Sequence, residues 1–272
     1  MPDKIGVLFI GDVIGRPGRR ALAKHLPSLK QKCRPDVVIV NAENAAGGIG
    51  ITRNVCHELL GYADVLTSGN HIWDKKEALS LLASEPRLLR PANYPPVNPG
   101  NGAFILDKGK QTIGILNLQG RVFMEPIDCP FRVADREIES LRNRTPVIIV
   151  DFHAEATSEK QAMGWYLDGR VSAVIGTHTH IPTADERVLP RGTAYITDIG
   201  MVGGYNSVIG IRRDQALDRF LTSRPQRFEP GKDGAIFSSV CIEIDSATGK
   251  ALDIRRQILV DESWDGEEGD EA

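Results

Sequence analysis

The sequence contains few cysteines, and they form no recognisable group. Its four cysteines are Cys33, Cys56, Cys129 and Cys241, and no two of them form a CxxC pair. A chain of 272 residues is long enough to bury a core without disulfides, so we expect all four to be reduced thiols. A structural zinc finger and an iron–sulfur centre are both disfavoured, because each requires clustered thiolates.

Long hydrophobic runs and dense basic clusters are also missing. No stretch reaches the ~18 apolar residues of a membrane span, and the apolar run over residues 5–10 is too short for a signal-peptide core. We therefore expect a cytoplasmic protein that does not contact the membrane. Without a basic patch, no stable binding to nucleic acid is expected. The glycines of GDVIGRPGRR fit neither GxGxxG nor a Walker A motif, which disfavours a dinucleotide-binding fold and a P-loop.

The composition is that of an ordinary globular protein, with 41% hydrophobic and 25% charged residues. The net charge of −3 conceals an asymmetry, because residues 261–272 contain seven acids and no lysine or arginine. The remaining body is weakly positive, which suits an anionic substrate. We expect a single domain over residues 1–260, followed by an acidic, flexible tail over residues 261–272.

Apolar runs that could form buried strands are followed directly by polar residues at five places in the chain. They are IGVLFI before GDVIG, DVVIV before NAENAAGG, DVLTS before GNHIWD, PVIIV before DFHAE, and SAVIG before THTH. Helical spacing occurs between most of them, over residues 19–32, 52–60, 75–83, 133–142 and 158–167. This alternation predicts an α/β fold with several parallel strands, whose carboxyl ends would share one edge of a sheet and bind ligand there.

The C-terminal third has a different pattern. TAYIT, GAIFSSVCIEI and ALDIRRQILV follow one another and predict antiparallel strands, including a hairpin at DSATGK. Residues 91–102, which read PANYPPVNPGNG, are expected to form an irregular loop.

Most of the histidines fall in the polar clusters after the predicted strands. These histidines are His71, His153, His178 and His180. Oxygen-bearing side chains accompany them, namely Asp12, Glu43, Asn44, Asn70 and Asp151. Taken singly, each has an ordinary explanation: Asp12 could cap a helix, and Asn44 could be a turn residue. Their convergence at one edge favours a polynuclear metal site.

The motif GTHTH places His178 and His180 two residues apart, so an extended backbone would direct both rings to the same face. By itself this spacing leaves open a pair of exposed imidazoles. The carboxylates of Asp12 and Glu43 make a two-metal site feasible, because a carboxylate can bridge two cations. Imidazole, carboxylate and amide ligands without thiolate suit iron, manganese, zinc or nickel, and this ligand set alone does not choose among them.

In this order and spacing, the motifs GD, NAEN, GNH, DFHAE and GTHTH resemble the calcineurin-like metallophosphoesterase superfamily, and in detail its YmdB-type bacterial branch of cyclic-nucleotide phosphodiesterases. The resemblance covers residues 6 to about 206. It implies a layered α-β-β-α sandwich of mixed sheets with helices on the outer faces. Two departures from the wider superfamily match the branch: Ile14 replaces a histidine, and Glu43 replaces the usual bridging aspartate.

The resemblance also implies a ligand set for two metal ions per chain. Metal 1 would be held by Asp12, Glu43, Asn44 and His180, and metal 2 by Glu43, Asn70, His153 and His178. Iron or manganese is the expected element, with zinc as the alternative. His71 is not expected to bind metal and is left to protonate the leaving group. Asp151 and Glu155 flank His153 and could orient its ring.

The implied activity is hydrolysis of a small phosphoester, namely a 2′,3′-cyclic and also a 3′,5′-cyclic nucleotide, by a metal-bound hydroxide. Two alternatives remain open. One is a general phosphomonoesterase with the same metal site, and the other is a regulatory protein that binds metal or nucleotide with little turnover. The sequence assigns no residue to the substrate base and leaves a homo-oligomer open.

Overall fold

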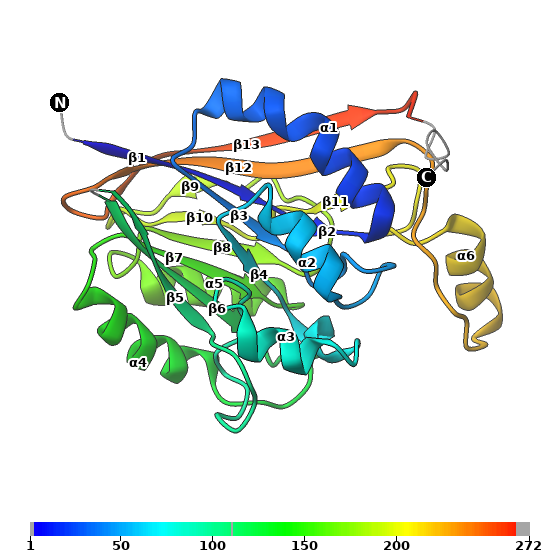
Figure 1. The fold of residues 1–272 in the computed structure, drawn as a ribbon, viewed down its shortest axis with the longest axis horizontal. Helices are drawn as coiled ribbons and strands as arrows, with labels where there is room; N and C mark the ends of the chain where they lie inside the picture. Colours follow the sequence, from blue (N-terminus) through cyan, green and yellow to red (C-terminus); the bar gives the residue numbers. More distant parts are fainter. Residues whose placement is uncertain (1–2, 110, 265–272) are drawn as a thin grey trace.

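The computed structural model describes residues 3–109 and 111–264, and two stacked β-sheets form its centre (Figure 1). The first sheet has the order β2-β11-β12-β1-β3-β4, with β13 beside β12. Its strands are β1 (Lys4–Ile10), β2 (Asp12–Val13), β3 (Val37–Asn41), β4 (Val65–Thr67), β11 (Met201–Gly203), β12 (Ala235–Asp245) and β13 (Ala251–Asp261). The second sheet has the order β5-β6-β7-β8-β10-β9. Its strands are β5 (Ala103–Lys108), β6 (Gln111–Gln119), β7 (Ile148–His153), β8 (Ala173–Thr177), β9 (Arg187–Val188) and β10 (Ala194–Ile196).

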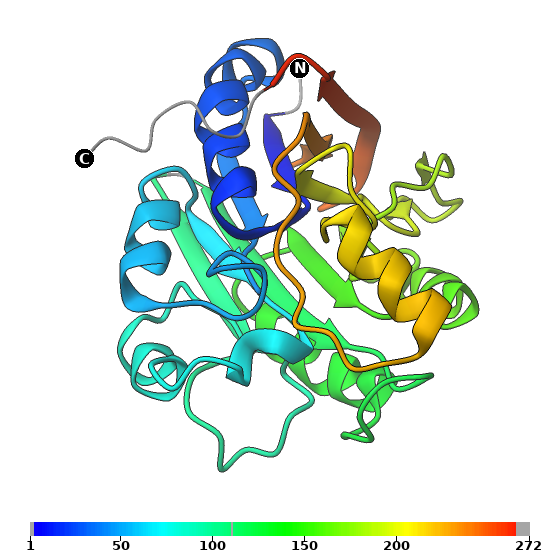
Figure 2. The same cartoon turned by 90° about the vertical axis from the view of Figure 1, so that its right-hand side faces the viewer.

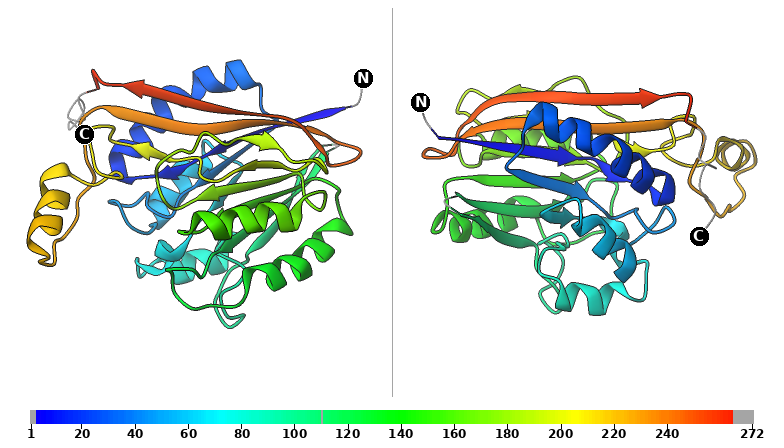
Figure 3. Two further views of the ribbon diagram at one scale, coloured as in Figure 1. Left: turned by 180° about the vertical axis from the view of Figure 1, so that it is seen from behind. Right: turned by 45° about the horizontal axis from the view of Figure 1, so that its top comes forward.

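Helices cover the outer face of each sheet. The first sheet packs against α1 (Gly15–Cys33), α2 (Arg53–Leu60) and α3 (Ala78–Ser84), and the second packs against α4 (Pro130–Arg142) and α5 (Thr157–Leu167). Figure 3 shows α4 and α5 against the second sheet from behind. These five helices match the five predicted segments. A sixth, α6 (Arg213–Thr222), was not predicted, although Ala216, Leu217, Phe220 and Leu221 have helical spacing; only Ala216 of it is buried.

Three apolar layers hold the sandwich together. Between the sheets, Phe9 and Ile39 of the first pack in one cluster with Ile115 and Ile149 of the second. Outside the first sheet lies a cluster containing the buried face of α1, and outside the second lies one containing that of α5. The central strands are therefore buried on both faces, which is why they read as continuous apolar runs. The predicted α-β-β-α sandwich of mixed sheets is confirmed.

The predicted placement of the five strands in one sheet is wrong. β1, β3 and β4 belong to the first sheet, whereas β7 and β8 belong to the second. A continuous apolar run identifies a buried strand but does not identify its neighbours, so the sequence could not separate the two sheets.

In the C-terminal third, the hairpin of β12 and β13 is confirmed. The TAYIT strand, β10, was expected to be antiparallel to its successors, but it pairs in parallel with β8 of the other sheet. Residues 91–102 contain no helix or strand, as predicted.

The cysteines correct another expectation. Cys33, the last residue of α1, forms a disulfide with Cys241 of β12, and their Cα atoms are 6.2 Å apart. They are separated by 208 residues in the sequence, but α1 packs along β12 and brings them together. Cys56 and Cys129 are free.

Ordered structure also continues a little beyond the predicted domain boundary at residue 260. β13 runs to Asp261, and Trp264 packs against the outer cluster of the first sheet. The rest of the predicted acidic tail lies outside the described residues. Among the described residues, no helix is long and apolar enough to span a membrane.

Candidate metal centre

All of the predicted ligand residues lie directly after strands or at strand ends. Asp12 begins β2 just after β1, Glu43 and Asn44 follow β3, and Asn70 begins the short 3-10 helix η1 (Asn70–Trp73) after β4. His153 is the last residue of β7, and His178 and His180 follow β8. The carboxyl ends of these strands point to the same end of the sandwich, which faces the viewer in Figure 2. The structure brings all seven side chains together there, in two groups.

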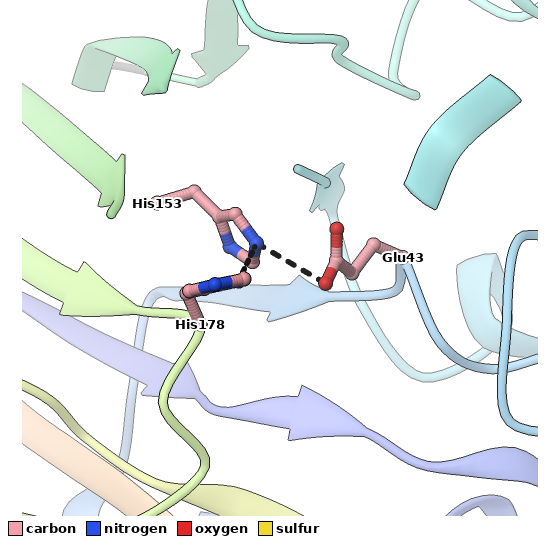
Figure 4. Close-up of side chains that lie close together, drawn as sticks. All are labelled: Glu43, His153 and His178. Carbon is pink, nitrogen blue, oxygen red and sulfur yellow. Dashed lines mark hydrogen bonds and ion pairs between the residues drawn. The ribbon is translucent and has the colours of Figure 1, made fainter. Parts of the chain in front are cut away.

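The first group is centred on His153. Its Nε2 lies 3.1 Å from Oε1 of Glu43, 3.0 Å from Nδ1 of His178 and 3.2 Å from Oδ1 of Asn70. Figure 4 shows the side chains of Glu43, His153 and His178 pointing toward one another from separate strand ends. Such a convergence of lone pairs on one point is the geometry that a cation requires.

The second group consists of Asp12, Glu43 and His180, and Glu43 belongs to both groups. Oδ1 of Asp12 is fully buried and has no hydrogen-bond partner, while Nε2 of His180 lies 3.9 Å away from it. An orphaned buried carboxylate oxygen is suited to bind a cation, because burial of such an atom without a partner is costly. Asn44 turns its Nδ2 toward Glu43 Oε1 at 2.9 Å and His180 Nε2 at 3.3 Å. To serve as a ligand, its amide would have to rotate and present Oδ1.

The electrostatics of the site favour a positive charge at its centre. Burial raises the pKa of Asp12. Burial would also raise the pKa of Glu43, but the adjacent His153 outweighs it and holds that pKa at about 2. Burial acts on His153 in the opposite direction, and the carboxylates of Glu43 and Asp12 overcome it, raising the pKa of the imidazole to about 9. The buried carboxylates therefore attract either a proton or a metal ion to the same place.

His178 differs from His153 in its protonation. Burial, and next the charge on His153, lower the pKa of His178 to about 3. Its ring is therefore neutral at physiological pH, and its nitrogen lone pair is available to a cation. The sequence led us to expect Glu155 to orient His153. Instead, Oε2 of Glu155 lies 3.1 Å from Nε2 of His178.

The turn that carries His178 and His180 is not the extended strand expected from the sequence. β8 ends at Thr177, and both histidines have left-handed backbones, with φ of 99° and 66°. Asp198 holds this turn, because its Oδ2 accepts hydrogen bonds from the backbone N–H of Thr179 at 3.0 Å and from the Thr179 hydroxyl at 2.8 Å. The two rings therefore point into the site because this turn is fixed, and not because they alternate along an extended strand.

Lys160 of α5 completes this support. Its Nζ lies 2.6 Å from Oδ2 of Asp198, and both side chains are only 1% exposed. Sequence reasoning missed both residues. Asp198 follows strand β10, just as the other acidic residues of the site follow their strands. This position after an apolar run could have identified Asp198 from the sequence. Lys160 gives no such signal, because a lysine in a helix is ordinarily exposed.

A buried chain of hydrogen bonds orients the ring of His153. Its Nδ1 lies 2.9 Å from the hydroxyl of Thr177, which donates to Oδ1 of Asp151 at 2.7 Å. Asn41 donates from Nδ2 to the other oxygen of Asp151 at 3.1 Å. Asp151 therefore supports His153 as expected, although it does so through Thr177.

His71 stands beside the metal site, and its side chain is 35% exposed. Its backbone N–H donates to Oε2 of Glu43 at 3.1 Å, and its Nδ1 lies 2.7 Å from Oδ2 of Asp74. Asp74, the residue directly after η1, was not singled out from the sequence, although its spacing of three residues from His71 could have revealed the contact. Gly69 permits the close approach of this segment, since a Cβ there would lie 2.1 Å from the His153 ring.

Two carboxylate–imidazole groups that share Glu43, placed where two stacked mixed sheets end, match the arrangement that the sequence motifs led us to expect of a metallophosphoesterase. A sequence model of the family described as YmdB-like protein matches residues 8–257, and the chain belongs to this family. It is 49% identical over 257 residues to the 2′,3′-cyclic-nucleotide 2′-phosphodiesterase of Bacillus subtilis (strain 168), covering 94% of this chain and 97% of that one.

Solved structures agree with this assignment. A crystal structure of a novel phosphatase from Mycoplasma pneumoniae superposes with a TM-score of 0.91 at 38% identity, covering 96% of this chain and 95% of that one. A crystal structure of a hypothetical protein from Thermus thermophilus superposes with a TM-score of 0.89 at 44% identity, covering 94% of this chain and all of the other. The fold therefore extends over nearly the whole length of both relatives.

Proposed function

We propose that this chain hydrolyses 2′,3′-cyclic nucleotides, and 3′,5′-cyclic nucleotides as further substrates, at a binuclear metal site. The observation that carries the proposal is the membership of Glu43 in both ligand groups, because a shared carboxylate is what a bridged metal pair requires. The printed activity of the Bacillus subtilis relative supplies the substrate class. Iron or manganese is the proposed element, with zinc as the alternative, and the cytoplasm the proposed compartment.

The proposed ligands fall into two sets. Metal 1 takes Asp12, Glu43, Asn44 and His180, and metal 2 takes Glu43, Asn70, His153 and His178. When bound, the two metal ions would lower the pKa of a water molecule toward neutrality and offset the negative charge of the phosphoryl oxygens. The protein's own contribution is to fix these side chains through Asp151, Asp198 and Glu155.

His71 is the proposed proton donor to the departing ribose oxygen. The carboxylate of Asp74 accepts the hydrogen bond from Nδ1, which leaves Nε2 as the nitrogen that can carry a transferable proton. An alkoxide is a poor leaving group, so protonation by a positioned imidazole accelerates its departure by ~10²–10⁴-fold. The hydrogen bond from the His71 backbone to Glu43 supports this role, because it keeps His71 next to the proposed metal ligands, where a phosphate would bind.

Activity and metal content of His71→Ala test the proposal together. The variant should retain two metal ions per chain by elemental analysis and lose at least about a hundredfold in kcat toward 2′,3′-cyclic AMP. His57→Ala is the matched control, because His57 is an exposed histidine of α2 outside the site. Loss of metal from His71→Ala would make His71 a ligand and contradict its assigned role.

The same assay separates the alternatives. Wild-type protein that cleaves phosphate monoesters but no cyclic nucleotide would be a general phosphomonoesterase. Protein that binds both ions and turns over neither class would be a regulatory binding protein. Anomalous scattering from crystals would identify the element, and finding one ion in freshly prepared protein would overturn the binuclear site.

A further inference from the structure

An exposed aromatic side chain lies at the opening of the metal site. A cleft of about 510 Å³ is lined by Asn70, His178 and residues 123–126. Phe123 is one of these residues and is 87% exposed. The volume falls within the usual range for a small-molecule site. The cleft therefore continues from the proposed metal 2 ligands to an uncovered phenyl ring.

The backbone at Phe123 is strained. Its φ is 62°, in the left-handed region that a bulky side chain rarely adopts. The ring contributes almost no packing to the fold, because it buries little of its surface. Strain at a residue that contributes no packing is characteristic of a functional position.

A buried carboxylate fixes the turn that presents this ring. Glu159 of α5 is 8% exposed and accepts hydrogen bonds from the backbone N–H of Arg121 at 3.0 Å and of Val122 at 3.1 Å. A second contact, from the N–H of Met124 to the carbonyl of Arg121, closes the turn. The backbone that carries the ring is thus fixed in advance, which reduces the entropy lost when a ligand packs on the ring.

The charged and polar groups that line the cleft determine how a bound nucleotide would be oriented. Glu125 lines the cleft together with Phe123 and repels a phosphate group, whereas the imidazole of His178 and the amide of Asn70 belong to the proposed metal site. A nucleotide would therefore place its phosphate among the metal ligands and its base toward residues 123–126. The carboxylate of Glu125 can accept a hydrogen bond from a ribose hydroxyl or a base amino group.

We propose that Phe123 is the stacking platform for the nucleobase of the substrate. This inference rests on the proposed function and adds the subsite that binds the base. Stacking on an aromatic ring tolerates every base, because each base has a π face. The subsite should therefore favour nucleotides over base-free phosphoesters without strong selection among the four bases.

The test compares 2′,3′-cyclic AMP with methyl ribofuranoside 2′,3′-cyclic phosphate, in which a methoxy group replaces the base. Phe123→Ala should raise KM for 2′,3′-cyclic AMP by about tenfold, the size expected for one base–aromatic stack, with little change in kcat. The same variant should leave kcat/KM for the base-free compound unchanged. Phe123→Trp should restore binding, and Phe220→Ala, which removes an exposed phenylalanine of α6, is the matched control.

An equal loss on both compounds, or no loss on either, would overturn the proposal. Failure of the proposed function gives a different result, namely that the wild type cleaves neither compound. Calorimetric titration with adenosine 3′-monophosphate then decides the subsite by itself: weaker binding to Phe123→Ala than to wild type supports it, and equal binding refutes it.

Discussion

Breaking the buried ion pair between Lys160 and Asp198 should destabilise the protein far more than breaking an exposed pair of similar length. Replacing Lys160 with methionine keeps most of the side-chain volume and removes the ammonium group. Asp198 then remains buried with its negative charge, although the N–H groups of Thr179 and Gly200 and the Thr179 hydroxyl still donate to it. The variant therefore leaves a buried carboxylate without its cation.

Removing one partner of a buried pair costs about 3–5 kcal/mol. We expect about 3 kcal/mol for Lys160→Met, at the lower end, because three donors remain on Asp198. Asp198→Asn should cost at least as much, because it leaves the ammonium unpaired and weakens the hold on Thr179. The double variant should cost less than the sum of the two, since neither charge remains.

Urea unfolding at pH 7 measures these differences, with a chelator present so that bound metal does not add to the stability. The control is Lys4→Met, since Nζ of Lys4 lies 2.8 Å from Oε2 of Glu243 but the two side chains are 52% and 36% exposed. Such an exposed pair contributes about 0–1 kcal/mol. Equal losses for Lys160→Met and Lys4→Met would refute the reasoning, as would strict additivity in the double variant.

Three further predictions concern single residues. Burial lowers the pKa of the His25 imidazole in the folded state. The free energy of unfolding should therefore fall as the pH drops below the ordinary value of 6.5, and the loss is complete below the lowered pKa of the folded state. In His25→Gln, the free energy of unfolding should depend less on pH between about pH 7 and 5 than in wild type. Gly69→Ala should displace the His153 ring and reduce the metal content, and an unchanged content would show that the ring can move aside. Burial raises the pKa of Cys56 to about 12, so a thiol reagent should modify the half-buried Cys129 first in the native protein; rapid labelling of Cys56 would contradict this.

The sequence was informative where a residue follows a buried strand. Glu43 and His153 could be placed together because apolar runs predict strands, and the carboxyl ends of parallel strands converge. The convergence extends even across two sheets, because the sheets stack with these ends at the same side. Strand convergence locates the Cα positions and says nothing of the side-chain contacts.

Other parts of the site depend on contacts that no local pattern encodes. The left-handed turn at His178 and His180 is held by Asp198, which follows β10, and Lys160 is buried against the same carboxylate. The contact of Cys33 with Cys241 likewise depends on packing between distant segments. Phe123 resembles any loop phenylalanine until its exposure and backbone angle are known.

The position of β1 determines when this protein can finish folding during its synthesis. One edge of β1 pairs with β3, which follows soon after it, but the other edge pairs with residues 239–245 of β12. A nascent chain that ends before residue 235 would contain every predicted metal ligand and still expose an unpaired apolar strand edge. Such an edge is a template for aggregation, so the ribosome must deliver the chain through β12 before β1 is protected on both edges.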